Sequence, residues 1–211
     1  MSAEPSDALD GVYAAQTPEE LNAAYQRWAE TYDRETIALG YCLPFVVTAW
    51  VARHVPREAG PVLDVGCGTG LSGPVLAALG YAHVEGLDFS PEMLRLAEAR
   101  GTYRRLTQAT LGETLPFADG AFAALFSTGV FTEGHAPASS MTELARILAP
   151  DGKAVLTVRS SILQSGGFEQ EFARLEAAKI WREVERSEPF RAFVMAEPEV
   201  LVQSFVFERN G

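Results

Sequence analysis

Residues 62–70 read VLDVGCGTG, an apolar run that breaks into three glycines spaced by two. A helical pattern follows directly, so this stretch predicts a buried strand, a tight turn and the start of a helix. A turn made of glycines lets a ligand approach the backbone closely, and free N–H groups at the start of a helix favour a carboxylate or a phosphate. The stretch therefore predicts a site for a polar, partly anionic cofactor.

The spacing of these glycines distinguishes between classes of cofactor. A dinucleotide fingerprint reads GxGxxG, whereas Gly66, Gly68 and Gly70 form the pattern GxGxG. Nicotinamide and flavin cofactors are therefore disfavoured. Asp64 is absent from the dinucleotide pattern and suits a ligand ammonium group, reached directly or through water.

A second strand, expected at 83–87, leads into another candidate site residue, Asp88. A carboxylate at the end of a strand can accept hydrogen bonds from both hydroxyls of a ribose. Phe89 beside it suits the edge of an adenine, and Met93 suits the same pocket. On the alternative interpretation, Asp88 is only a capping residue and Met93 only a core residue.

From residue 61 onward, short apolar runs alternate with helical stretches, which indicates βα units around a mostly parallel sheet. The expected strands are 62–65, 83–87, 103–107, 121–127, 153–159, 190–195 and 201–208. The link 196–199 is too short for a parallel crossover, so the last two strands must form an antiparallel hairpin. The prediction is an α/β fold with a seven-stranded mixed sheet and helices on both faces, including one at 168–185.

The segment before residue 60 predicts an N-terminal helical cap. Thr17 and Glu20 have the spacing of a capping box, and Pro18 suits the first helical position, so a helix should run to about Leu39. A second helix, apolar nearly all round and therefore expected to be buried, is predicted at 43–55. The expected division of the chain is a flexible segment at 1–16 and one domain at 17–211, comprising the cap at 17–57 and the cofactor-binding core and C-terminal hairpin at 60–211.

Composition places the chain among globular proteins of about one domain, with 211 residues, 47% of them hydrophobic and 21% charged. A net charge of -11 disfavours nucleic acid as a partner. Cys42 and Cys67 form neither a disulfide framework nor a zinc spacing, which suits a reducing compartment. The start, MSAEPSDALDG, lacks the pattern of a signal peptide, and no apolar run is long enough to span a membrane. A cytoplasmic location is expected.

Four stretches together resemble the class I S-adenosylmethionine (SAM)-dependent methyltransferases. They are LDVGCGTG at 63–70, GLDFSPEMLRLAEARG at 86–101, ETLPFADGAFAALFS at 113–127 and ELARILAPDGKAVLTVR at 143–159. The run AYQRWAETYD at 24–33, continuing to Gly40 and Tyr41, is similar in addition to the Williams–Beuren syndrome region methyltransferase-like proteins. The resemblance spans about 21–208 and implies a Rossmann-like class I methyltransferase fold.

The resemblance also implies a cofactor, SAM, with S-adenosylhomocysteine as product, and a set of residues around it. The implied cofactor residues are Tyr32, Asp64, Gly66, Cys67, Gly68, Gly70, Asp88, Phe89, Met93, Thr110, Leu111, Ser127 and Thr128. Tyr32 would close over the cofactor carboxylate. Many relatives have Asp where this chain has Thr110, which weakens the expected contact to the adenine. Many also read F-D-x-V where residues 122–125 read FAAL.

Methyl transfer from a sulfonium is an in-line displacement in which the protein mainly aligns the reactants, and it requires no metal. If the acceptor is a hydroxyl or an acidic carbon, a base must lie near it, and His135 in the loop after the fourth strand is the expected base. On the alternative interpretation, His135 only shapes the pocket or binds substrate. The loop lacks the Asn/Asp-Pro-Pro-Tyr tetrapeptide, so methylation of a nucleic-acid base is disfavoured.

The acceptor itself is not identified by the sequence. An aromatic acceptor pocket is expected, and its candidate residues are Tyr25, Trp28, Phe131, Glu133, Trp181 and Phe190, although each aromatic equally suits the core. A small molecule is the expected acceptor, a protein acceptor stays open, and a monomer or a homodimer is expected. The alternative function is a SAM-binding sensor or regulatory protein without catalysis, while a nicotinamide-dependent oxidoreductase is disfavoured by GxGxG.

Overall fold

A single mixed sheet forms the centre of the molecule in the computed structural model, which describes residues 11–12, 14 and 17–211. The strand order within them is β3-β2-β1-β4-β5-β8-β6, and β7 also pairs with β8. The strands are β1 (Val62–Val65), β2 (Val84–Asp88), β3 (Arg105–Gln108), β4 (Phe122–Phe131), β5 (Leu148–Arg159), β6 (Trp181–Arg186), β7 (Phe190–Arg191) and β8 (Leu201–Arg209). Strands β1 to β5 pair in parallel, and β8 is antiparallel to its partners. The predicted mixed α/β fold is confirmed.

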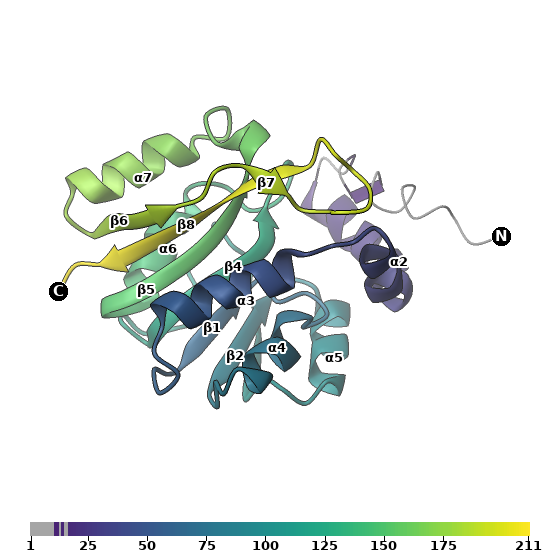
Figure 1. Cartoon of the computed structure of the whole chain (residues 1–211), viewed down its shortest axis with the longest axis horizontal. Helices are drawn as coiled ribbons and strands as arrows, with labels where there is room; N and C mark the ends of the chain where they lie inside the picture. The colour runs from purple at the N-terminus through teal and green to yellow at the C-terminus, as the bar shows by residue number, and fades with distance from the viewer. Residues whose placement is uncertain (1–10, 13, 15–16) are drawn as a thin grey trace.

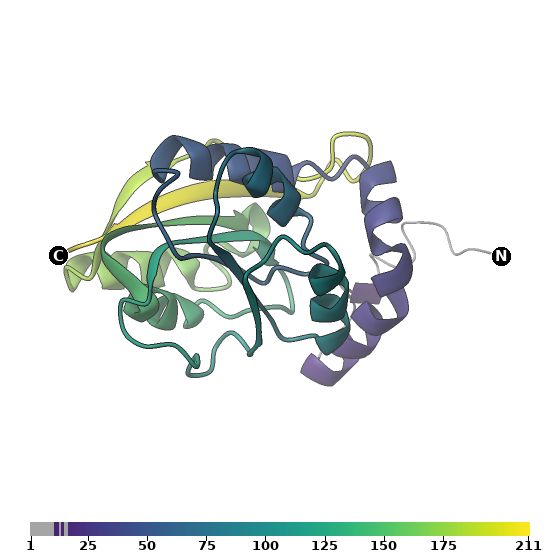
Figure 2. The same cartoon turned by 90° about the horizontal axis from the view of Figure 1, so that it is seen from below.

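Helices cover both faces of this sheet (Figure 1). They are α2 (Pro18–Ala38), α3 (Leu43–His54), α4 (Ser72–Ala78), α5 (Pro91–Ala99), α6 (Ser140–Ile147) and α7 (Phe168–Ala177), with a short 3-10 turn, η1, at Ser160–Ile162. In Figure 2, α3 and α4 lie on one face and α6 and α7 on the other, while α2 stands across the end of the sheet away from the C-terminus. None of the helices in the described part of the chain combines the length and the apolar character of a membrane span.

The central strands are buried on both faces, and each face belongs to a different hydrophobic cluster. Leu125 and Leu156 belong to the cluster that contains residues of α6 and α7. Phe126 and Val155, their neighbours in the chain, belong to the cluster that contains residues of α3 and α4. Successive side chains of a strand point to opposite faces, so apolar residues at every position produce a sheet with two covered faces.

The C-terminal part of the sheet differs from the prediction. The helix expected at 168–185 ends at Ala177, and Trp181–Arg186 is instead a strand that pairs antiparallel with β8. Within the described part of the chain the sheet therefore has eight strands, where seven were predicted. Lys179 has a φ of 56°, in the left-handed region that ends a helix, and the Trp181 ring stacks on Phe207 with 4.3 Å between centroids. The predicted antiparallel pairing of 190–195 with 201–208 is confirmed, although β7 is only two residues long.

The N-terminal helices begin where the sequence predicts. The Thr17 hydroxyl accepts the N–H of Glu20 at 3.2 Å, which confirms the expected start of α2. Helix α3 follows the prediction in its bounds but not in its burial, because the Phe45 side chain is 64% exposed. The segment 1–16, expected to be flexible, lies outside the described residues except at 11, 12 and 14.

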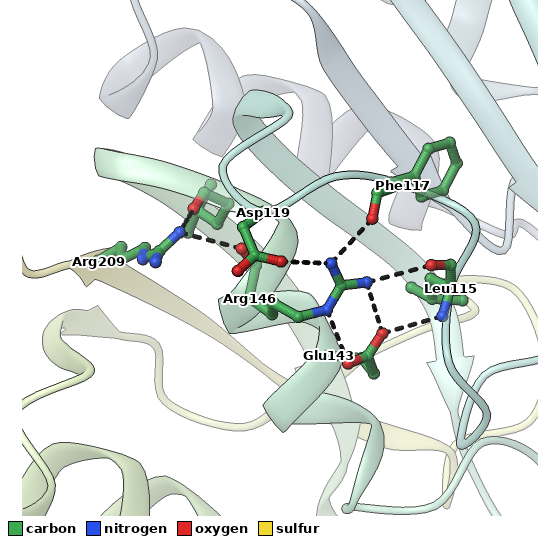
Figure 3. Close-up of polar contacts among 7 residues, drawn as sticks. Leu115, Phe117, Asp119, Glu143, Arg146 and Arg209 are labelled. Atoms are coloured by element: carbon green, nitrogen blue, oxygen red, sulfur yellow. Dashed lines mark hydrogen bonds and ion pairs between the residues drawn. The ribbon is translucent and has the colours of Figure 1, made fainter.

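One guanidinium holds the connection between β3 and β4 against α6 (Figure 3). Arg146 donates to the carbonyl oxygens of Phe117 at 2.8 Å and Leu115 at 3.1 Å. The same group pairs with Asp119 at 2.7 Å and with Glu143 at 2.8 Å, and Glu143 also accepts the N–H of Leu115 at 2.9 Å. These contacts fix a connection that has few backbone hydrogen bonds of its own.

Replacement of Arg146 by Met should lower the free energy of unfolding by about 1–3 kcal/mol, because two carbonyl oxygens and two carboxylates lose a charged donor. Urea unfolding measures the effect. Arg174→Met is the matched control, since Arg174 also pairs with a glutamate three residues earlier in the last turn of its helix, but in an exposed position. Equal effects of the two substitutions would contradict the role given to Arg146.

Candidate functional site

The glycine turn between β1 and α4 adopts a backbone that side chains would disturb. Gly66, Gly68 and Gly70 have φ values of 71°, 53° and 83°, in the left-handed region that glycine tolerates best. A Cβ on Gly66 would collide with Val130, and one on Gly70 would lie 2.8 Å from the Tyr103 ring. A Cβ on Gly68 would meet nothing within 4 Å. Gly66 and Gly70 are therefore required by packing, whereas Gly68 faces open space.

A pocket lies beside this turn, at the carboxyl ends of the parallel strands. Most of its wall comes from the turns after β1, β2, β3 and β4, and helix α2 closes it from outside the sheet. The lining residues are Tyr25, Tyr32, Gly66, Gly68, Leu87, Asp88, Phe89, Met93, Ala109, Thr110, Leu111, Thr128, Gly129, Val130, Gly134, His135, Ala136 and Pro137. Ligands of open α/β sheets bind in this position, so the pocket is the candidate site.

Asp88 is held by two backbone donors from different turns. Its Oδ2 accepts the N–H of Gly68 at 2.8 Å, and its Oδ1 accepts the N–H of Ser90 at 2.9 Å. Burial raises the pKa of Asp88, and these backbone hydrogen bonds oppose the rise. Ser90, not Asp88, caps helix α5, since its hydroxyl accepts the N–H of Met93 at 3.4 Å. Asp88 therefore presents a fixed carboxylate to the pocket.

Asp64 is a second buried carboxylate next to the glycine turn. Its side chain accepts the Tyr103 hydroxyl on Oδ2 at 2.7 Å, while Oδ1 has no hydrogen-bond partner among the described residues. Burial raises the pKa of Asp64 to about 7; the Tyr103 hydrogen bond opposes the rise and the charge of Asp88 adds to it. An unsatisfied buried acceptor of this kind favours a cationic partner.

Helix α2 is fastened to the glycine turn by Asp33. The Thr69 hydroxyl donates to Asp33 Oδ1 at 2.6 Å, and Arg100 pairs with Asp33 Oδ2. Arg100 also donates to the Thr69 carbonyl at 2.6 Å, so the three residues form a closed set of contacts. This set joins α2, the turn after β1 and the end of α5 at one point of the pocket rim.

A second contact joins α2 to the loop after β4. The Tyr25 hydroxyl lies 3.0 Å from His135 Nε2, and the two rings meet edge to face with 5.9 Å between centroids. On its other side Tyr25 meets Phe89 edge to face, at 6.1 Å. Burial lowers the pKa of His135, and the Glu133 carbonyl and carboxylate oppose this. His135 is therefore a neutral imidazole at neutral pH.

The structure brings most of the predicted site residues together. The predicted residues that line the pocket are Tyr25, Tyr32, Gly66, Gly68, Asp88, Phe89, Met93, Thr110, Leu111, Thr128 and His135. The remaining cofactor candidates, which belong to the supporting structure instead of the lining, are Asp64, Cys67, Gly70 and Ser127. The prediction thus located the wall of the pocket from four different strands and from α2.

Most of the residues predicted to bind the acceptor do not line the pocket. Phe131 and Trp181 are fully buried in the core, and the Trp28 indole donates to Glu35 at 2.7 Å. Glu133 pairs with Arg159 at 3.0 Å. None of these residues lines the pocket, nor does the sixth candidate, Phe190. Of the expected acceptor wall, Tyr25 alone is part of the lining, because the other side chains have partners elsewhere.

Sequence reasoning missed two groups of residues. Asp33 and Arg100 hold the pocket rim, and Ala136 and Pro137 add apolar lining after His135. The run AYQRWAETYD at 24–33 contained a signal for the first group, because its resemblance to relatives includes the pair Tyr32-Asp33. No sequence signal connected it with Arg100, which lies 67 residues away.

The sequence and the fold of the chain match known methyltransferases. Residues 63–156 match the family model of a methyltransferase domain. The chain is similar to methyltransferase-like protein 27 of Homo sapiens, with 37% identity over 163 residues that cover 74% of the chain and 66% of that protein. It is also similar to a demethylmenaquinone methyltransferase of Clavibacter sepedonicus, with 32% identity over 142 residues, 66% of the chain and 58% of that protein. The chain thus spans less than two thirds of the length of these relatives.

The fold of the chain is also similar to that of a solved methyltransferase structure. It is the putative methyltransferase of Haloferax volcanii in complex with the Trm112 methyltransferase activator, with a TM-score of 0.66 and 18% identity. The match covers 89% of this chain and 96% of that one. Residues 63–156 therefore belong to the methyltransferase domain family, and the chain has the fold of the class I SAM-dependent methyltransferases.

Proposed function

We propose that this chain transfers a methyl group from SAM to a small-molecule acceptor. The observation that carries the proposal is the pair of buried carboxylates, Asp64 and Asp88, on either side of a glycine turn that opens onto a pocket. SAM has an ammonium group and two ribose hydroxyls, which are donors that carboxylates accept. Its remaining parts are a carboxylate, an adenine and a sulfonium.

The lining residues, and the buried carboxylate of β1 next to the glycine turn, fit these groups. Asp64 Oδ1 lacks a hydrogen-bond partner among the described residues and suits the ammonium group. Gly68 leaves the space that a Cβ would fill, so a ligand can lie against its backbone. Asp88 suits the ribose hydroxyls, since its carboxylate lies in the pocket lining and is held there by backbone donors.

The apolar part of the pocket suits the rest of the cofactor. Phe89 and Leu111 lie beyond Asp88 and offer apolar surfaces to an adenine, and Thr110 offers a hydroxyl. Tyr32 covers the pocket from helix α2, where the Asp33 contacts hold it. Helix α2 and the sheet together can exclude water from the reacting groups.

When bound, SAM supplies a methyl group on a positively charged sulfur, which a nucleophile attacks in line. The protein's part is to hold the acceptor in line with that methyl group in a dry pocket, which contributes on the order of 7–11 kcal/mol to such reactions. His135 lies in the lining and has an orienting hydrogen bond from each side, so it is placed to take a proton from the acceptor. This arrangement supports an enzyme over a sensor that only binds SAM.

A small acceptor is supported by charge. The chain carries a net charge of -11, which repels the phosphates of nucleic acids. Among the described lining residues there is no lysine or arginine. The name of one relative, demethylmenaquinone methyltransferase, also denotes a small-molecule substrate.

Replacement of Asp88 by Asn should weaken SAM binding at least tenfold, because the ribose hydroxyls lose a charged acceptor worth about 1.5–3 kcal/mol. Titration calorimetry with SAM and with S-adenosylhomocysteine measures the effect, and NAD serves as the negative ligand. Glu98→Ala, an exposed position on the neighbouring helix α5, should bind as the unchanged chain does. Absence of SAM binding by the unchanged chain, or tighter binding of NAD, would refute the proposed function.

The affinity for SAM should fall as the pH is lowered from 8 to 6, because the pKa of Asp64 is about 7 and only its ionised form pairs with an ammonium group. Asp64→Asn should bind weakly at both pH values and remove most of this dependence. Calorimetry at the two pH values measures it. An unchanged pH dependence in the variant would exclude Asp64 as its source.

The same substitution should stabilise the free protein at pH 8. Folding raises the pKa of this carboxyl, so its protonated form stabilises the folded state at low pH. This stabilisation is lost as the pH rises through the pKa in the folded state, which is about 7. Asn cannot ionise, and its carbonyl still accepts the Tyr103 hydroxyl. Thermal unfolding should therefore show a higher Tm for Asp64→Asn at pH 8, with a smaller difference at pH 5. A lower Tm at pH 8 would show that the buried charge is not destabilising.

A further inference from the structure

The contact between Tyr25 and His135 joins two segments that both line the pocket but lie 110 residues apart in the chain. The other ring nitrogen of His135, Nδ1, lies 2.8 Å from the Glu133 carbonyl oxygen. A carbonyl oxygen only accepts, so Nδ1 carries the proton of the neutral ring. Nε2 therefore presents its lone pair, and the Tyr25 hydroxyl donates to it.

The neighbours of this pair keep the imidazole in that form. The Thr132 hydroxyl lies 2.9 Å from the same Nδ1 and can accept from it together with the Glu133 carbonyl. The Glu133 carboxylate is paired with Arg159 at 3.0 Å. The ring is half-buried, and this loss of hydration lowers the pKa of His135. His135 is thus a neutral base in a fixed orientation, and its lone pair is reached through the Tyr25 hydroxyl.

The lining near the pair limits the charge of the acceptor. Val130, Ala136 and Pro137 are apolar, and Tyr25 is flanked by Phe89. Asp88 is the one carboxylate of the described lining, and the lining holds no lysine or arginine. An acceptor with its own carboxylate or phosphate would lose hydration here without gaining a cationic side chain as partner. The side chains of the lining therefore favour an uncharged acceptor.

We infer that Tyr25 and His135 form a proton relay, and that the methyl acceptor is an uncharged phenol or enol. This inference rests on the proposed function. A hydroxyl oxygen becomes a strong nucleophile only as its proton leaves, so it gains most from a nearby base. A neutral amine attacks with its own lone pair and does not need to lose a proton first. Phenols and enols are more acidic than alkyl alcohols, so imidazole can assist their ionisation.

The relay moves one proton over two hydrogen bonds. The acceptor hydroxyl donates to the Tyr25 oxygen, and as its proton moves there, the Tyr25 proton passes to His135 Nε2. The acceptor oxygen forms a bond to the methyl carbon, and the electron pair of the broken carbon–sulfur bond stays on sulfur as a neutral thioether. The positive charge of the sulfonium is thereby replaced by that of the imidazolium, which releases its proton to solvent after the product leaves.

The first test uses the histidine ring signals in NMR and needs no acceptor. The chain has three histidines, and the His83→Gln and His135→Gln variants assign their signals. We expect His135 to carry its proton on Nδ1 and to titrate below the ordinary pKa of histidine. Tyr25→Phe, which keeps the ring but removes the hydroxyl donor, should raise that pKa. A proton on Nε2, or no change in Tyr25→Phe, would overturn the relay.

The second test compares acceptors that share one ring system, with SAM as donor and S-adenosylhomocysteine formation as readout. The probes are 2-naphthol, 2-naphthylamine and 3-hydroxy-2-naphthoate, with 4-hydroxycoumarin as an enol. We expect transfer to 2-naphthol or 4-hydroxycoumarin, and at least tenfold less to the amine and the carboxylate. Preference for the amine or the carboxylate would overturn the acceptor class. So would the absence of transfer to every hydroxyl probe when the protein binds SAM. Lack of SAM binding in calorimetry would instead refute the proposed function.

The pH profile separates a relay from a merely structural role. Tyr25→Phe and His135→Gln should each lower kcat for the hydroxyl probe by about 10²–10⁴, the usual range for a general base, while SAM affinity changes less than about threefold. In the unchanged chain, kcat should reach a plateau above the pKa of His135. In His135→Gln, it should keep rising with pH as the probe itself ionises. The exposed His83→Gln control should keep the plateau, and a plateau retained in His135→Gln would overturn the relay.

Discussion

The Asp88 carboxylate accepts backbone N–H groups from two turns at once, that of Gly68 at 2.8 Å and that of Ser90 at 2.9 Å. These turns follow β1 and β2, which are neighbouring parallel strands. A charged acceptor between two backbone donors forms stronger hydrogen bonds than a neutral one, so it fixes the distance between the turns. The pocket wall from β1, β2 and α5 depends on this one side chain, and the glycines supply the backbone freedom that lets Gly68 reach it.

The two buried carboxylates place negative charge in a low-dielectric part of the protein. Burial raises the pKa of both Asp64 and Asp88, and the charge of Asp88 raises that of Asp64 further. Such a pair is destabilising when ionised and becomes favourable when a cation lies beside it. The folded state therefore carries a local instability that a cationic ligand relieves, which is a physical reason for placing a positively charged cofactor against this turn.

Much of the fold followed from local signals. The glycine turn, the caps at Thr17 and Ser90 and the alternation of strands and helices each depend on residues close in sequence. The sequence of Trp181–Arg186 favours a helix because its charged residues are good helix formers, and only pairing with β8 makes it a strand. The site shows the same limit: glycines and Asp88 were recognisable locally, whereas contacts such as Asp33 with Arg100 exist only after folding.

The contacts of Asp33 have a consequence for where the functional unit begins. The stretch 63–156 that matches the family model contains the glycine turn and Asp88, but not Tyr25, Tyr32 or Asp33. Those residues come from α2, and Asp33 binds directly to Thr69 inside the glycine turn. A fragment cut at the start of β1 would keep five parallel strands and lose one wall of the pocket. The smallest piece of this chain with the complete pocket therefore starts at α2, well ahead of the stretch that matches the family model.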